Sequence, residues 1–322
     1  MEAGIILCMS QNIHQQLSDR LGAVHARQRL GIEEEAPRVF GRGINFFHPE
    51  NWYSAHSILR FLLKASGLYW YGRQRASAIR RRENKIVLPH LPRAFDGLTI
   101  LHLSDLHVDM NPKATQALIN LVENLDYDIC VITGDYRAWT SGSIDAAMAG
   151  MRSLCTVLHQ PVYAVLGNHD SIRMVPELED MGIQMLLNES TIIEIQGEEL
   201  YLAGIDDAHY YRVDNLEKSA EDIPHEAVSI LLSHTPEIYR QAAHSGYDVM
   251  LCGHTHGGQI CLPGGIPLTL DAKCPRYMGS GSWQYHTMQG YTSVGAGTSI
   301  VDVRLNCLPE VTLHRLHSIA AE

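Results

Sequence analysis

The sequence predicts an α/β fold in which two β-sheets pack together and are covered by helices. Two observations predict it. After Pro92, short apolar segments alternate with helical segments of ten or more residues, which is typical of parallel β-α-β units. Beyond the glycine-rich turn at Gly257 the pattern changes to short strands. A chain of 322 residues, of which 45% are hydrophobic, can bury a core of this size.

The regular region begins with alternating strands and helices. Short apolar runs predict buried strands, and longer amphipathic runs predict helices. In chain order these are a strand over residues 98–103, a helix over 112–125, a strand over 128–133, a helix over 143–158 and a strand over 162–166. The second half continues with strands over 200–205 and 228–233, a helix over 236–244, and strands over 249–252, 291–294, 299–303 and 311–316.

Polar clusters lie where several of these predicted strands end. The clusters are residues 104–107, 134–136, 167–170, 233–234 and 253–256. Because the carboxyl ends of strands in an α/β sheet line one crevice, we expect the clusters to converge. The side chains that could bind metal there are those of Asp105, His107, Asp135, Asn168, His234, His254 and His256.

The residue types at these positions suit two divalent cations. Asp105 and His107 stand at i and i+2, so in an extended segment both would point to one side and hold one cation. His254 and His256 repeat that spacing. Asp135 is the candidate bridging carboxylate of a pair of cations, across which a phosphoester would fit. Imidazole, carboxylate and amide ligands without thiolate favour Mn, with Fe or Zn as alternatives.

Charge and cysteine content limit the class of protein. A net charge of -11 argues against specific nucleic-acid binding, although residues 60–85 carry eight Lys or Arg and one acid. Seven scattered cysteines without a Cys-x-x-Cys pair indicate neither a disulfide framework nor a structural zinc site. Residues 1–10 lack the basic region of a signal peptide, and no apolar run is long enough to span a membrane. We expect a cytoplasmic protein, soluble or peripheral on the inner face of the membrane.

The ordered blocks Asp-x-His, Gly-Asp, Gly-Asn-His-Asp, His and Gly-His-x-His resemble those of the calcineurin-like metallophosphoesterase family, over residues 88–316. The resemblance implies a four-layer α/β/β/α sandwich of two mixed β-sheets flanked by helices, with a dinuclear centre. It implies that one metal is held by Asp105, His107, Asp135 and His256, and the other by Asp135, Asn168, His234 and His254.

The same resemblance implies a role for His169, which would lie beside the metals and stabilise the phosphoryl transition state or protonate the leaving oxygen. Asp170 would orient His169 or cap a helix. Ala138 replaces a second aspartate that many members carry after the Gly-Asp block, which costs no metal ligand. The Gly-Asp-Tyr-Arg and Gly-Asn-His-Asp segments differ from those of Ser/Thr protein phosphatases, so we expect a phosphorylated small-molecule or lipid substrate.

Finer features resemble a bacterial branch of membrane-associated phosphoesterases. These features are residues 91–97, 253–259 and 295–310. The branch includes a UDP-2,3-diacylglucosamine pyrophosphatase of lipid A synthesis, which makes that molecule the best substrate candidate. Members commonly begin with a transmembrane helix, which we do not find in this sequence.

The N-terminal part differs in character from the rest. We expect a partly helical extension over residues 1–90 and a catalytic domain over 91–322. Within the extension, residues 51–82 combine aromatic, apolar and basic side chains, as interfacial segments do, and could contact a membrane. A helix packed on the enzyme body is the alternative, and Gly67 and Gly72 weaken a continuous helix.

Three functional hypotheses follow. The first is hydrolysis of a nucleotide-linked lipid, the second is hydrolysis of a soluble phosphodiester such as a cyclic nucleotide, and the third is a non-catalytic metal-binding scaffold. The complete ligand set argues against the scaffold. By position alone, Tyr136, Arg137, Trp139 and Asp170 are candidate substrate contacts.

Overall fold

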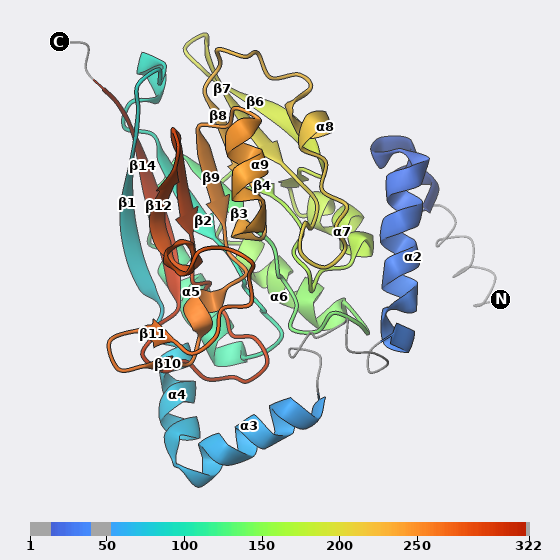
Figure 1. The fold of residues 1–322 in the computed structure, drawn as a ribbon, viewed down its shortest axis with the longest axis vertical. Coiled ribbons are helices and arrows are strands. Elements are labelled where there is room, and N and C mark those ends of the chain that lie inside the picture. Colours follow the sequence, from blue (N-terminus) through green and yellow to red (C-terminus); the bar gives the residue numbers. More distant parts are fainter. Residues whose placement is uncertain (1–13, 40–52, 320–322) are drawn as a thin grey trace.

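The structure is a computed structural model that describes residues 14–39 and 53–319 (Figure 1). The expectation about residues 1–10 lies outside the described residues, as do residues 51 and 52 of the basic, aromatic segment.

The first sheet has six strands. Their spatial order is β1 (Arg80–Leu88), β14 (Glu310–Ser318), β2 (Thr99–Leu103), β3 (Ile129–Ile132), β4 (Val162–Ala164) and β5 (Ile183–Met185). Strands β2 to β5 are parallel, β14 is antiparallel to β2, and β1 is parallel to β14. The sheet is therefore mixed, and its parallel part carries three of the five polar clusters.

The second sheet also has six strands and is mixed. Their spatial order is β12 (Gly281–Tyr285), β13 (Met288–Thr292), β9 (Val249–Cys252), β8 (Ser229–Leu232), β7 (Glu198–Gly204) and β6 (Glu189–Ile195). The central strands β13, β9, β8 and β7 are parallel, and both edge strands are antiparallel to their neighbours. A two-stranded hairpin, β10 (Cys261–Leu262) with β11 (Ile266–Pro267), stands apart.

Alternation of side chains along the strands produces the layers. In β2, Ile100 packs between the sheets, whereas Leu101 faces the core beneath helices α5 (Pro112–Val122), α6 (Asp145–Cys155) and α7 (Val175–Asp180). In β8, Ile230 lies between the sheets and Leu231 faces the side of α8 (Leu216–Ala220) and α9 (Tyr239–His244). Because each sheet is apolar on both faces, helices cover both outer faces. The predicted α/β fold of two mixed sheets flanked by helices is confirmed.

The N-terminal residues add helices and one strand. Helix α2 (Ala23–Val39) follows a helical stretch over residues 14–21, and α3 (Tyr53–Ala65) and α4 (Leu68–Ala76) form a hairpin. Gly67, with a φ of 75°, interrupts the helical backbone between α3 and α4. Strand β1 lies inside the range expected for the extension, yet it pairs with β14 along its whole length. Its first six residues are polar and mostly exposed, and the apolar run is only the last three residues, 86–88, which is why the sequence pattern missed it.

One predicted strand is wrong. Residues 299–303 form an irregular loop instead. The Gln259 amide nitrogen donates to the carbonyl oxygens of Ser299 (2.8 Å) and Val301 (3.0 Å), and Ile300 has a φ of 65°. Side-chain hydrogen bonds thus replace the sheet ladder that the apolar run suggested.

Candidate metal centre

The five polar clusters lie together at the carboxyl ends of the parallel strands. Strands β2, β3 and β4 lead into Asp105 and His107, Asp135 and Asn168, while β8 and β9 lead into His234, His254 and His256. A hydrogen bond links the loops of the two sheets here: the backbone N–H of His254 donates to the side-chain carboxylate of Asp105 (3.0 and 3.1 Å). Gly253 permits this approach, since a Cβ atom there would lie 1.8 Å from the Ser104 hydroxyl oxygen.

The backbone at these residues is left-handed rather than extended. Positive φ angles are uncommon outside glycine, and they cluster at functional sites. Five of the seven ligand candidates have them: Asp105 (49°), His107 (39°), Asp135 (58°), His254 (71°) and His256 (49°). The extended geometry predicted for the pairs at i and i+2 was therefore wrong. Each side chain is aimed by a tight turn after its strand.

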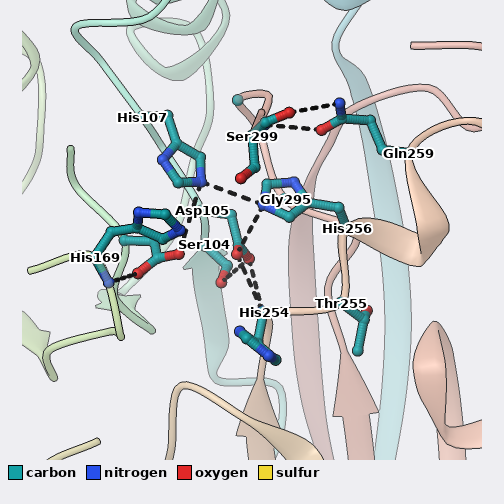
Figure 2. Close-up of polar contacts among 12 residues, drawn as sticks. Ser104, Asp105, His107, His169, His254, Thr255, His256, Gln259, Gly295 and Ser299 are labelled. Carbon is teal, nitrogen blue, oxygen red and sulfur yellow. Dashed lines mark hydrogen bonds and ion pairs between the residues drawn. The ribbon is translucent and has the colours of Figure 1, made fainter. Parts of the chain in front are cut away.

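The first group consists of Asp105, His107, Asp135 and His256. One ligand atom from each lies within 4.8 Å of the others, and all four residues are buried. The His107 and His256 Nε2 atoms are 3.2 Å apart, and the Asp105 carboxylate lies 3.4 Å from His256 Nε2. Figure 2 shows the rings of His107 and His256 converging beside Asp105.

The second group converges in the same way. The Asn168 side-chain oxygen lies 2.9 Å from both His234 Nε2 and His254 Nδ1. Asp135 Oδ2 lies 3.4 Å from His234 Nε2 and 3.7 Å from His107 Nε2, which belongs to the first group. The Asp135 carboxylate is thus placed between the two groups, where a bridging ligand would stand.

Backbone carbonyls orient two of the rings. Nδ1 of His107 lies 2.7 Å from the carbonyl oxygen of Arg137, and Nδ1 of His234 lies 2.7 Å from that of Thr133. A carbonyl oxygen can only accept, so Nδ1 carries the proton in both rings. Each Nε2 lone pair is left facing the centre, which is the arrangement that outer hydrogen bonds impose on metal-binding histidines.

The electrostatics suit a cation. Burial lowers the pKa values of His254 and His256 well below the usual range, so both rings are neutral. Burial would raise the pKa of Asp135, but the nearby His234 and His169 outweigh it and hold that pKa well below its usual value. Burial lowers the pKa of His234, yet Asp135 raises it further, to about 10. His234 can therefore carry a second proton on Nε2, facing Asp135, and a bound cation would take the place of that proton.

These residues fit two divalent cations. The donors are imidazole nitrogens, carboxylate oxygens and an amide oxygen, they are buried, and they converge in two groups that share Asp135. Each group offers four side chains.

His169 lies beside the first group. Its ring is 5.4 Å from that of His107, centroid to centroid, and its backbone N–H donates to Asp135 Oδ1 (2.9 Å). The Thr140 hydroxyl lies 3.2 Å from His169 Nδ1. The ring is therefore held at the edge of the centre.

The structure argues against three of the expected substrate contacts. Tyr136 is fully buried, and its hydroxyl donates to the carbonyl of Val165. The buried Arg137 guanidinium donates to the carbonyls of His169, Thr140 and Gly142. Arg137 therefore supports the His169 loop rather than facing a substrate.

Asp170 is the third. Its buried carboxylate accepts from the backbone N–H groups of Asp135 (2.7 Å), Tyr136 (2.8 Å) and Gly167 (2.8 Å). It ties the turn after β3 to the turn after β4, and burial raises its pKa to about 6. It neither caps a helix nor contacts the His169 ring through any of these bonds. The remaining candidate, Trp139, is exposed.

Comparison with known proteins agrees with this geometry. The calcineurin-like phosphoesterase family model matches residues 98–258. The metallophosphoesterase YkoQ of Bacillus subtilis is 32% identical over 229 residues, which are 68% of this chain and 83% of that protein. The chain belongs to the calcineurin-like phosphoesterase family. It is thus a metal-dependent phosphoester hydrolase of a family that uses a dinuclear divalent metal site.

Two further relatives of this phosphoesterase are similar over most of its length. Phosphodiesterase YaeI of Escherichia coli is 29% identical over 227 residues, covering 67% of this chain and 81% of that protein. A transmembrane protein with metallophosphoesterase domain from Danio rerio is 30% identical over 253 residues, which are 71% of this chain and 55% of that protein. In the part of this phosphoesterase that the structure describes, no helix is long and apolar enough to cross a bilayer.

Sequence patterns missed a line of hydrogen bonds that ends on Asp105. The Asn84 amide donates to His314, whose Nε2 lies 3.2 Å from His102 Nδ1. The other His102 nitrogen lies 2.9 Å from the Thr133 hydroxyl. Thr133 then donates to Ser104, and Ser104 donates to the Asp105 carboxylate (2.6 Å). The line fixes the carboxylate from behind, and its members are too scattered in sequence to be recognised there.

A buried arginine supports the other wall. Arg304 is fully buried and donates to the carbonyls of His256, Val294 and Gly297. One of its nitrogens lies 3.2 Å from His256 Nδ1. Arg304 therefore holds the His256 turn against the last loop of the phosphoesterase.

Helix α2 braces the His169 loop from outside the residues that the family model matches. The fully buried Arg29 donates to the carbonyl of Asp170 (2.9 Å). The Glu33 carboxylate accepts from the Ser171 hydroxyl (2.6 Å) and the Ile172 N–H (2.7 Å). The loop that carries Asn168 and His169 thus rests on a helix more than 130 residues earlier in the chain.

Proposed function

We propose that this phosphoesterase hydrolyses a phosphodiester or pyrophosphate whose neighbouring group is apolar, as in a lipid. The observation that carries the proposal is a cavity of about 300 Å³ that opens on the metal centre. One end is formed by five residues of the centre: Asp135, Asn168, His169, His254 and His256.

The rest of the cavity wall has a different character. Its apolar side chains are those of Leu59, Ile260, Leu268, Ile300 and Val301, and its polar residues include Gln259, Thr269 and Asp271. Among the described residues, no Lys or Arg lines it. A chain of three or more phosphates would need cationic partners beyond the metal centre, whereas an apolar tail would be desolvated by the apolar side chains of this wall. The cavity thus favours a scissile phosphate at the centre and a hydrocarbon group against the apolar side chains.

Two divalent cations, Mn being the best candidate and Fe or Zn the alternatives, would be held by the two groups that share Asp135. Bound there, they would supply an activated water and polarise a phosphoryl oxygen. The chain's own contribution is orientation: the Asp135 carboxylate separates the two groups, and the carbonyls of Arg137 and Thr133 keep His107 and His234 in the ligating tautomer.

His169 has the next role. It lies at the cavity wall beside the centre, where its ring would stabilise charge on the phosphoryl group or protonate the leaving oxygen as the phosphorus–oxygen bond breaks. The contact with Thr140 and the backbone bond to Asp135 hold the ring in that place. A general acid acts only when it is held within reach of the leaving oxygen.

The specific candidate is UDP-2,3-diacylglucosamine, which would yield UMP and a lipid monophosphate, on the cytoplasmic face of a membrane. The test is to load the purified protein with Mn and to compare that lipid with bis(4-nitrophenyl) phosphate and cyclic AMP. We expect cleavage of the lipid and of the aryl phosphodiester. Faster turnover of cyclic AMP than of the lipid would point to a soluble phosphodiesterase instead.

A pair of variants tests the cavity itself. Leu268→Ser removes an apolar side chain from the cavity wall, and we expect the KM for the lipid to rise about tenfold with the KM for the aryl ester unchanged. Leu262→Ser is the matched control, because Leu262 is also exposed but does not line the cavity. Equal effects on both substrates would contradict an apolar subsite.

A third comparison tests the scaffold hypothesis. His169→Ala should keep its metal, measured by elemental analysis, and lose activity on the aryl ester by about 100-fold or more. A protein that holds metal but shows no activity on the aryl ester that this change lowers would be a metal-binding scaffold.

A further inference from the structure

The hairpin of α3 and α4 lies at the edge of the molecule, away from the two sheets (Figure 1). Its inner side packs on the loop of residues 299–305: Leu63 is buried with Val301, Val303 and Leu305. Gly72 brings α4 close, because a Cβ atom there would lie 2.9 Å from Val303 Cβ, and its carbonyl accepts from the Arg304 N–H (2.9 Å). The hairpin is therefore fixed to the enzyme body.

Helix α3 is apolar on more of its circumference than this packing uses. Leu59 and Leu63, four residues apart, face the body. Ile58, Phe61 and Leu62, at i, i+3 and i+4, form a second stripe that is exposed. An amphipathic helix of a soluble body normally turns a polar stripe to water, whereas this second stripe is apolar and is not used for packing among the residues that the structure describes.

Helix α4 continues the same surface. Leu68, Trp70 and Tyr71 are exposed, while Tyr69 packs on the body. Together with Ile58, Phe61 and Leu62 they make a face of six large apolar or aromatic side chains, which we call the docking face. Their exposed fractions lie between 45% and 68%. Exposed apolar clusters of this kind mark interaction sites.

The charged side chains of α3 and α4 are all Lys or Arg. Residues 53–82 contain seven Lys or Arg and no Asp or Glu, in a chain whose net charge is -11. Arg60 and Lys64 lie on α3, and both are exposed. Arg73 and Arg75 lie in the last turn of α4, where Arg73 also pairs with the Asp302 carboxylate (2.9 Å). Trp and Tyr beside Lys and Arg are the residues that prefer the boundary between lipid head groups and acyl chains.

We propose that the docking face binds the surface of an anionic lipid bilayer, with its aromatic and aliphatic side chains in the head-group boundary and its basic side chains on the lipid phosphates. Helix α3 has 13 residues and is too short to cross a bilayer, so the hairpin lies in the plane of the surface. This docking rests on exposure and charge and does not depend on the substrate.

The docking face also lies next to the catalytic cavity. Leu59, on the side of α3 that faces the body, forms part of the cavity wall. A bilayer beneath α3 would therefore place lipid one helix away from the cavity. A soluble substrate would gain nothing from that arrangement.

The experiment is co-sedimentation of the full chain with sucrose-loaded vesicles, without substrate. One set of vesicles is an equimolar mixture of phosphatidylglycerol and phosphatidylcholine, and the other is phosphatidylcholine alone. We expect strong binding to the anionic set. The double variant Phe61→Ser with Leu62→Ser should lower the partition coefficient about tenfold or more. Ile192→Ser, at an exposed isoleucine on β6, is the matched control and should bind like the wild type.

Charge is tested separately. Arg60→Gln with Lys64→Gln should weaken binding to the anionic vesicles by about fivefold for each charge removed, and should leave binding to phosphatidylcholine unchanged. Trp70 offers an optical signal, because its fluorescence should shift to the blue on binding and the shift should shrink in Trp70→Phe.

Two results would overturn the proposal. One is equal vesicle binding by the wild type and the Phe61/Leu62 double variant. The other is no vesicle binding together with a dimer in sedimentation equilibrium that the double variant dissociates, which would make the face a contact between two copies. Thermal unfolding confirms that each variant is folded. A protein that binds vesicles but cleaves no lipid would keep the docking and lose the proposed substrate.

Discussion

At the scale of single residues, we expect the Thr140 hydroxyl to help orient the His169 ring beside the metal centre. Thr140→Val removes the hydroxyl that lies 3.2 Å from His169 Nδ1. We expect kcat on the aryl phosphodiester to fall about tenfold while KM changes little, because the ring would be less well oriented for proton transfer. Thr140→Ser keeps the hydroxyl and should behave like the wild type. A rise in KM alone would place Thr140 in substrate binding instead.

The buried histidines behind Asp105 make stability depend on pH. Burial lowers the pKa of His102 to about 3, and burial together with the neighbouring His102 lowers the pKa of His314 well below its usual value. Both rings stay neutral in the folded protein but take up protons below pH 6.5 when it unfolds. Their stabilisation is therefore complete above pH 6.5 and declines as the pH falls from 6.5 toward 3.

The free energy of unfolding should therefore fall with pH below pH 6.5, and the slope can be measured. His314→Gln should reduce the fall in the free energy of unfolding by about 1.4 kcal/mol per pH unit below pH 6.5, measured by urea titration between pH 7.5 and pH 5. The exposed His225 provides the control variant, His225→Gln, whose slope should match that of the wild type. Parallel slopes for all three proteins would mean that His314 is protonated in the folded state as well.

At the scale of elements, α2 is the brace of the catalytic loop. The Arg29 guanidinium lies 3.1 Å above the Tyr211 ring, 3.4 Å from the Asp206 carboxylate and in contact with the Asp170 carbonyl. Arg29→Met would leave Asp206 with His25 as its remaining ion-pair partner. We expect the free energy of unfolding to fall by about 3 kcal/mol and kcat to fall as well, since the His169 loop loses a support.

The matched control for this brace is Arg27→Met, on the same helix but exposed. It should change the free energy of unfolding by less than about 0.5 kcal/mol. Thermal unfolding and turnover of the aryl ester measure both effects. Lower stability with unchanged kcat in Arg29→Met would restrict α2 to a role in folding.

At the scale of the whole molecule, the metal centre joins the two sheets, so its occupancy should affect the stability of the entire fold. Ligands come from strands of both sheets, and a bound cation stabilises only the folded state. At a free metal concentration 100 times Kd, the gain is about 2.7 kcal/mol for one site. We expect chelator-treated protein to melt at a lower temperature and Mn to restore the higher one.

Asp135→Asn is the comparison for this measurement. It removes the carboxylate that both groups share, so the increase in melting temperature on adding Mn should be smaller than in the wild type. An equal increase in both proteins would show that Asp135 does not bind metal. Calorimetry at several Mn concentrations provides the reading.

The sequence alone predicts the α/β class, the central strands, the helices between them and the order of the candidate ligands. It can do so because apolar periodicity is a local property, and because polar residues that follow buried strands must lie at one edge of the sheets. It misses β1, whose first six residues are polar and mostly exposed, and it predicts a strand at 299–303, where the Gln259 side chain donates to the backbone instead.

The tertiary structure decided what depends on contacts between distant residues. Three features depend on segments that are distant in sequence. They are the left-handed turns at the candidate ligands, the hydrogen bonds from Arg29 and Arg304, and the internal hydrogen bonds that occupy Tyr136, Arg137 and Asp170. The basic, aromatic segment shows the difference most clearly. Its composition suggests an interface, but only the packing of Leu59 and Leu63 on the body reveals which side remains exposed.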